Sequence, residues 1–243
     1  MDSRELYSDL KTIPPIFVRL DGRSFHHLAR SIDLKKPFDE LFCDAMCRVS
    51  SWLIDRSGLN VAFTYSFSDE ISAYVPFVPF NGRVEKIDST FAAFCASTLT
   101  IALNIAEPIA FDARVIQVGG EATIAYLIQR QQEAWRNHVN AYCQQALIDE
   151  GMDSSAAAEV LKGTPSPVLH DMMFSRGINL AKTPAWQRRG ILIYRSLEKK
   201  EGYNPVTQQL VTANRWVVQI NQELPLFTTP EGRSLIESLA NQT

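Results

Sequence analysis

One stretch, residues 61–75 with the sequence VAFTYSFSDEISAYV, constrains the fold of this chain more than any other. Its two halves consist of aromatic, β-branched and small residues, which half-buried strands favour. Ser66, Ser68, Asp69 and Glu70 interrupt this pattern in the way that a tight turn does. The stretch therefore predicts a β-hairpin with two carboxylates at or beside its tip.

A second, shorter run leads to another carboxylate. Residues 16–20, IFVRL, are typical of a strand, and they run directly into a turn over residues 21–26, DGRSFH. If this strand neighbours the hairpin, Asp21 and Asp69 meet at one sheet end, where their oxygens can hold two Mg²⁺ ions that in turn hold phosphates. Strand parity points Asp69 and Glu70 to opposite faces, which makes Glu70 the weaker candidate ligand. The alternative is an Asp-Gly turn beside a solvated hairpin tip.

The turn over residues 21–26 is also a candidate phosphate-binding loop. In this interpretation its backbone N–H groups face a triphosphate, namely those of Gly22, Arg23, Ser24, Phe25 and His26. A single glycine makes the loop less specific than a Walker loop, so a plain turn is the alternative. His26 and His27 are adjacent and cannot both point into one site.

The order of the remaining elements predicts the fold class. Helices are expected over residues 37–56, 83–106 and 122–150, and a shorter one over 156–163 with Ser154 or Ser155 as its cap. Strands are expected at residues 111–118, 190–196 and 215–221. A polar arm is expected at residues 197–210. Strand, helix, hairpin, helix, strand is the order of the split β-α-β palm of nucleotide polymerases and cyclases. We therefore expect an α/β (α+β) fold: a ferredoxin-like antiparallel sheet with helices on one face, plus a helical and β-arm extension. Residues 1–121 would form the palm and 122–243 the extension, with a soft boundary that also allows one domain.

Charge and apolar content restrict the environment of the protein. A net charge of −3 gives no overall attraction to nucleic acid, so any basic patch must be local. The first residues are polar and acidic, unlike a signal peptide, and no apolar run approaches the ~20 residues that cross a bilayer. We expect a cytoplasmic protein without a membrane segment. Its four cysteines lack Cys-x-x-Cys spacing, so buried free thiols are favoured over a zinc site.

Several cations are candidates for contact with phosphate or RNA. Lys36, Arg83, Lys86 and Arg114 lie near predicted helix starts or on a strand expected beside the carboxylates. The alternative for each of them is a solvated charge.

Two further groups of polar residues are candidates for binding RNA. On the expected long helix the group is Arg130, Arg136 and Asn137, for which a solvent-facing helix is the alternative. The one local basic concentration comprises Lys182, Arg188, Arg189, Arg195, Lys199 and Lys200, with Trp186, Tyr194 and Tyr203 between them. Cations and aromatic rings together suit a single-stranded RNA end or a tRNA acceptor stem, whereas a charged β-arm that only maintains solubility is the alternative.

Five blocks resemble, in the same order and at similar spacing, the tRNA-histidine guanylyltransferase superfamily of 3′-to-5′ nucleotide-adding enzymes. The blocks are RLDGRSFHHL, KPFDELFCDAM, YSFSDEISAYV, FDARV and RRGILIYR, and the match that they anchor covers most of residues 14–197. The resemblance implies a polymerase-like palm that uses two Mg²⁺ ions to add GTP or another nucleoside triphosphate to the 5′ end of tRNA. ATP would serve where that end is activated by adenylylation. Homodimers or homotetramers are implied as well.

The resemblance also implies roles for individual residues. Asp21, Asp69 and the Gly22 carbonyl would bind the metals, with Glu70 assisting. Residues 21–26, with Ser68 and Asp69, would line the triphosphate site. Lys36 would serve in activation, and Asp39, Lys86 and Arg114 would bind phosphate or the 5′ end.

One departure from the family pattern bears on specificity. Where guanylyltransferases carry His-Ile-Asn-Asn on the long helix, this chain reads Trp135-Arg136-Asn137-His138. The departure favours the branch that repairs truncated tRNA 5′ ends by template-dependent addition, because base pairing can then select the nucleotide. The alternatives are addition of a single guanosine at position −1 of histidine tRNA, a palm nucleotide cyclase, and a tRNA-binding module without catalysis.

Overall fold

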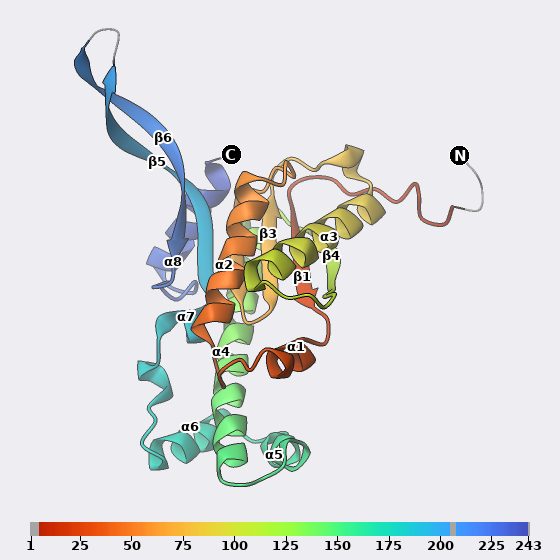
Figure 1. The fold of residues 1–243 in the computed structure, drawn as a ribbon, viewed down its shortest axis with the longest axis vertical. Coiled ribbons are helices and arrows are strands. Elements are labelled where there is room, and N and C mark those ends of the chain that lie inside the picture. The colour runs from red at the N-terminus through yellow and green to blue at the C-terminus, as the bar shows by residue number, and fades with distance from the viewer. Residues whose placement is uncertain (1–4, 205–207, 243) are drawn as a thin grey trace.

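A six-stranded antiparallel sheet forms the centre of the molecule, in the order β4-β1-β3-β2-β5-β6 (Figure 1). It is seen in a computed structural model that describes residues 5–204 and 208–242. The strands are β1 (Ile16–Gly22), β2 (Phe63–Phe67), β3 (Glu70–Val75), β4 (Phe111–Gln117), β5 (Ile191–Asn204) and β6 (Gln209–Asn221). Strands β1 to β4, with two crossover helices, form the predicted ferredoxin-like unit.

Eight α-helices and two short 3₁₀ turns accompany the sheet in the described residues. The α-helices are α1 (Phe25–Ser31), α2 (Glu40–Asp55), α3 (Val84–Leu103), α4 (Glu121–Asp149), α5 (Ser154–Leu161), α6 (Ser166–Ser175), α7 (Ala185–Arg189) and α8 (Pro230–Asn241). Helices α2 to α5 confirm the predicted ones, although Asp153, not Ser154 or Ser155, caps α5. The sequence did not predict α1, α6, α7 or α8. None of the described helices is both long and apolar enough to cross a membrane.

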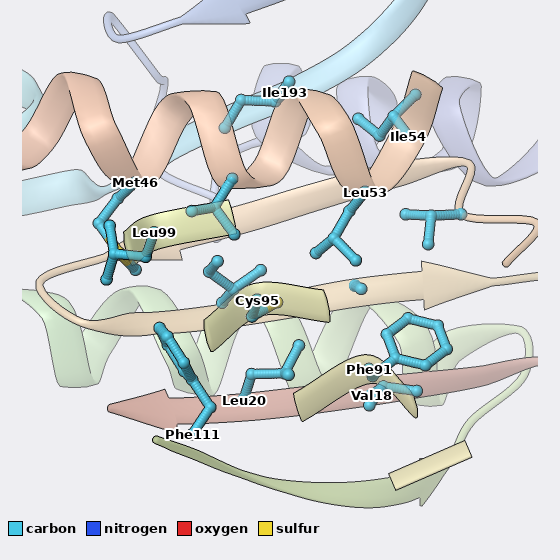
Figure 2. Packing of buried hydrophobic residues seen from close by; sticks show 14 of the residues in the cluster. Val18, Leu20, Met46, Leu53, Ile54, Phe91, Cys95, Leu99, Phe111 and Ile193 are labelled. Carbon is cyan, nitrogen blue, oxygen red and sulfur yellow. The ribbon is translucent and has the colours of Figure 1, made fainter. Parts of the chain in front are cut away.

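Helices cover both faces of the sheet, not one face as expected. Helices α2 and α3 pack on the face that carries Val18, Leu20 and Ile71, and Figure 2 shows side chains of this core. Helix α4 covers the opposite face, where Phe17 and Tyr74 contact its apolar side chains. The sequence of helix α4 is compatible with a solvent-facing helix because only a narrow stripe of it is apolar. That stripe is enough to pack the helix on the sheet, because the sheet face opposite it is aromatic.

The sheet continues across the boundary proposed at residue 121. Strand β5 pairs with β2 from Phe63↔Tyr194 to Ser66↔Ile191, so the extension supplies the last two strands of the palm's own sheet. Beyond this pairing, β5 and β6 continue as a two-stranded arm that projects from the body in Figure 1. Tyr203 and Trp216 on the arm are exposed.

Candidate active site

Asp21 and Asp69 meet at one end of the sheet. Asp21 lies opposite Glu70 in the β1–β3 register, and the backbone N–H of Gly22 donates to the carbonyl of Asp69 at 3.2 Å. Burial and the nearby Asp21 carboxylate raise the pKa of Asp69, while Lys36 lowers it to a smaller degree. The two side chains that sequence reasoning paired are therefore close enough to interact electrostatically.

These two carboxylates fit a divalent cation that is shared with a substrate. The raised pKa of Asp69 means that its negative charge is poorly compensated by the protein. Within the described residues, no group of three His, Cys, Asp or Glu side chains could by itself hold a metal. Mg²⁺ commonly takes one or two carboxylates and completes its shell with water and substrate phosphates. Asp21, Asp69 and the Gly22 carbonyl would supply the protein share.

A pocket of about 270 Å³ opens beside Asp69. Its wall is mainly apolar or aromatic and carries a few polar groups, as ligand pockets do. Lining residues include Phe38, Phe42, Cys43, Met46, Phe67, Trp186 and Ile191, with Lys36, Ser68, Asp69, His26 and Asn137 as polar members. An apolar wall beside carboxylates and a lysine is the combination that a base with attached phosphates requires.

The loop before α2 presents Lys36 to this pocket and uses Asp39 to hold its own shape. The Asp39 carboxylate accepts from the backbone N–H groups of Lys35 at 2.8 Å and Phe42 at 3.0 Å, and it caps α2. Burial opposes ionisation of Asp39, but these backbone donors hold its pKa below the ordinary value. The expected role of Asp39 in contacting phosphate is therefore corrected. Its carboxylate oxygens accept backbone hydrogen bonds that hold the loop carrying Lys36 in place.

The predicted phosphate-binding loop is only partly available. The N–H of Gly22 donates to Asp69, and that of Arg23 donates to the carbonyl of Ala110 at 2.9 Å, so neither can bind phosphate as expected. Ser24, at φ 60°, leads into α1, whose first N–H groups at Phe25 and His26 have no acceptor within the helix. The Phe25 ring is buried, so this residue can offer a ligand only its backbone.

Gly22 brings the backbone against a ring that cannot move away. A Cβ at this position would meet the Phe25 ring at 2.6 Å, and Phe25 itself packs on Phe42 and Phe111. We expect Gly22→Ala to destabilise the protein by about 1–3 kcal/mol and to reduce metal affinity, because the β1 end must shift. Gly119→Ala is the matched control, since its Cβ would meet nothing within 4 Å. Thermal unfolding measures both; equal stability of the two variants would contradict the packing argument.

Glu70 and Arg130 correct two predictions together. Arg130 Nη1 donates to both Glu70 carboxylate oxygens, at 2.9 and 3.3 Å, and both side chains are about nine-tenths buried. Arg130 is thus not a surface contact for RNA. Burial raises the pKa of Glu70 to about 7 against the opposing effect of Arg130. Because Glu70 faces α4 and is engaged there, it supports the turn that carries Asp69 and is not placed as a metal ligand.

Comparison with known proteins finds one group of similar proteins. A family model described as tRNAHis guanylyltransferase (Thg1) matches residues 1–119. The Arabidopsis thaliana protein "tRNA(His) guanylyltransferase 1" is 26% identical over 84% of this chain, and a "Probable tRNA(His) guanylyltransferase" of Dictyostelium discoideum is 29% identical over 74%. The chain spans 39% of the length of the Arabidopsis relative and 75% of the Dictyostelium one. Over its first 119 residues this chain is similar to the tRNA-histidine guanylyltransferases, and relatives of that name extend the similarity over most of its length.

Solved structures extend the likeness in fold to nearly the whole chain. The structure titled "Bacterial tRNA(HIS) Guanylyltransferase (Thg1)-Like Protein in complex with ATP" matches with a TM-score of 0.74 and 22% identity, covering 96% of this chain and 94% of that one. A matching structure of a similarly titled protein is in complex with GTP. Members of the guanylyltransferase family are nucleotidyltransferases. The likeness extends well beyond the residues that the family model matches.

Lys86, which the superfamily pattern suggested for the 5′ end, and Arg83, a candidate contact for phosphate or RNA, lie far from the carboxylates. Strand β3 leads away from Glu70, so α3 begins beyond the opposite end of the sheet (Figure 1). There the backbone of Arg83 forms an isolated antiparallel β-bridge with that of Lys11. Lys86 is therefore not beside the carboxylates as expected, since strand β3 alone spans about 20 Å. The same distance separates Arg83 from them. Arg114 stays on the near side: it lies two residues from Asp112, the β4 partner of Asp21.

The basic concentration near the C-terminal half is divided among three places. Arg195 donates to the Ile54 carbonyl at 2.6 Å and fixes β5 to the end of α2. Lys199 and Lys200 are exposed on the arm, about 30 Å along β5 from Ile191. Arg188 and Arg189 lie on the α4 side, where exposed Arg136 joins them around a second pocket.

Sequence reasoning missed the aromatic wall of the first pocket. Phe38 and Phe42 were given no part in the site from the sequence, and Trp186 was named only as a ring among cations that suit RNA; all three line the pocket. For Phe38 a sequence signal was present, because Asp39 is a residue type that caps helices and does cap α2, which leaves Phe38 outside the helix. Asn137, the asparagine shared with the superfamily's His-Ile-Asn-Asn pattern, also lines this pocket.

Proposed function

We propose that the chain is a template-dependent 3′-5′ nucleotidyltransferase that repairs the 5′ end of tRNA, using GTP and other nucleoside triphosphates with two Mg²⁺ ions. The observation that supports it best is the pair Asp21 and Asp69 beside an apolar pocket that also contains Lys36. Relatives named as tRNA(His) guanylyltransferases and structural neighbours titled as ATP and GTP complexes support the substrate classes.

Each residue has a defined part in this proposal. Mg²⁺, when bound, would neutralise phosphate charge and favour ionisation of an attacking hydroxyl. Asp21, Asp69 and the Gly22 carbonyl would hold it, and Phe42 and Trp186 would enclose the base. Lys36 would face the phosphates or the activated 5′ end, where ATP-dependent adenylylation would take place. Because pairing to the opposing strand selects the nucleotide, the protein needs to recognise only stem shape and phosphates.

Addition of one guanosine at position −1 of histidine tRNA is the second candidate, and the names of the relatives favour it. Against it stands the helix that reads Trp135-Arg136-Asn137-His138. Here His138 is fully buried, and its Nε2 lies 2.8 Å from Thr183 Oγ1, so it is not available to a substrate.

A single assay separates the two candidates. A 5′-triphosphorylated tRNA without its first nucleotide is incubated with Mg²⁺ and each nucleoside triphosphate in turn. We expect addition only of the nucleotide that is complementary to the opposing base, for several tRNAs. Guanosine addition regardless of that base would establish the second candidate instead. Turnover of a nucleoside triphosphate without RNA would indicate a cyclase. Light scattering would test the homodimer or homotetramer that the resemblance implies.

Lys36 provides a pH-dependent prediction. Its charge lowers the pKa of Asp69, so Lys36→Met should raise that pKa, and a higher pH is then needed to ionise the carboxylate. The acid limb of the rate against pH should therefore move to higher pH, and KM for the triphosphate should rise. Lys35→Met is the matched control, because the charge of Lys35 acts on Asp39. An unchanged acid limb in Lys36→Met would contradict this role.

A further inference from the structure

A second pocket, of about 510 Å³, lies across helix α4 from the first. It is lined from α4, α7, Ala181 and the segment before α8 by Ile128, Gln131, Gln132, Trp135, Arg136, Ala181, Arg188, Arg189, Leu226 and Thr228. Asn137 and Ala141 of α4 line the first pocket, and they lie on the side of the helix opposite Trp135, which lines the second. The two pockets are therefore separated by the width of one helix, about 10 Å.

The wall of the second pocket is held in place before any ligand arrives. Gln131 accepts from the backbone N–H of Phe227 at 2.8 Å and donates to the Pro225 carbonyl at 3.1 Å. Arg189 donates to the Leu224 carbonyl at 2.7 Å, and Arg188 donates to the Thr183 carbonyl at 2.9 Å. These bonds fix the segment that carries Leu226 and Thr228 against α4 and α7.

The charge of the pocket favours an anion. Three guanidinium groups line it, and two acids oppose them: Glu133 pairs with Arg136, and Glu223 lies near Arg188. Burial, and next the neighbouring Arg189, lower the pKa of Arg188, which indicates that positive charge is crowded here. Beside the arginines, Ile128, Trp135 and Leu226 provide an apolar surface that suits a base.

We propose that this pocket binds the unpaired 3′ end of the RNA strand that opposes the repaired 5′ end. The inference rests on the proposed function, which puts the 5′ terminus beside Asp69. Between the pockets runs a ridge of exposed or half-exposed polar residues on α4, Glu133, Arg136, Asn137 and Asn140. A stem that ends against this ridge would send its paired 5′ nucleotide to one side and its single-stranded 3′ extension to the other. Phosphates there meet arginines, and a base meets the apolar wall.

The test compares two RNA stems that differ only in the 3′ extension. Each carries a 5′-triphosphate and lacks the first nucleotide, so that the opposing template base is unpaired. The RNA called blunt ends at this template base, and the other continues beyond it into a short single-stranded 3′ overhang that contains 2-aminopurine. For the unmodified protein we expect the overhang to tighten binding on the order of 10-fold, since one base in such a contact contributes about 1–3 kcal/mol. The 2-aminopurine fluorescence should change on binding.

Two variants address the pocket itself. Arg136→Ala removes an exposed cation, and Leu226→Ser removes a half-exposed apolar side chain, so both proteins should fold. In each, the affinity ratio between overhang and blunt RNA should fall towards one. Arg48→Ala, on the exposed side of α2, is the control and should keep the full ratio.

A ratio of one in the unmodified protein, or a full ratio in both pocket variants, overturns the inference. Failure of nucleotide addition to either RNA would instead overturn the proposed function, because the binding ratio does not depend on turnover.

Discussion

Asp69→Asn should reduce nucleotide addition on the order of 10³-fold while RNA binding persists, because the metal loses one of its two carboxylates. The same change should leave the metal-free protein as stable as before or slightly more stable. Burial and Asp21 raise the pKa of Asp69, so its ionised form costs folding free energy at neutral pH, and the neutral amide removes that cost. Thermal unfolding with and without Mg²⁺ gives a readout independent of turnover: Mg²⁺ should stabilise only the protein with Asp69 intact.

Asp112 provides the matched control at the same sheet end. It lies opposite Asp21 on β4, is exposed, and forms only a 3.5 Å contact with Arg114. Asp112→Asn should retain addition and the stabilisation by Mg²⁺. If Asp69→Asn added nucleotides at the normal rate, or if Asp112→Asn lost activity equally, the assignment of the metal site would be wrong.

Glu70→Ala should lower the free energy of unfolding by about 3–5 kcal/mol and the melting temperature by about 10 °C. The reason is that Arg130 would remain buried without its partner carboxylate. A double variant, Glu70→Gln with Arg130→Met, should recover much of this loss, since no uncompensated charge is then buried. Thermal unfolding measures all three proteins.

A surface pair on the same helix is the control for this ion pair. Arg136 contacts Glu133 one turn away, where the arginine is more than half exposed. Glu133→Gln should change stability by less than about 0.5 kcal/mol, as expected for an exposed pair. A loss from Glu70→Ala no larger than that from Glu133→Gln would show that the buried pair is not important for stability.

The sequence predicted the parts of the site that depend on strand pattern. Alternation interrupted at Ser68 and Asp69 is a local signal, and the strand leading into Asp21 is another; together they located the two carboxylates. The position of α3 could also have been deduced. A strand that begins at Glu70 must lead away from the site, so the helix after it, with Arg83 and Lys86, starts at the far end of the sheet.

Other features depend on contacts between distant segments, which a local pattern does not show. Arg130 lies in a helix whose composition is that of a solvent-exposed one, and only its pairing with Glu70, 60 residues earlier, shows that it is buried. Helix α1 is too short for a periodic signal, so the loop after Asp21 was interpreted as an open phosphate cradle. The wall at Leu224–Phe227 is fixed by Gln131 from nearly 100 residues earlier in the chain.

The way in which the sheet is assembled affects how the protein is made. Strand β2 acquires its second neighbour only when β5 leaves the ribosome. The aromatic face around Phe17, Phe63 and Tyr74 is covered by α4 and by Leu224, Phe227 and α8, which are made later still. At ordinary rates of synthesis, on the order of 10 s pass between the completion of β4 and that of β5. During that interval the nascent chain exposes an unpaired strand edge, so we expect it to require chaperones during translation.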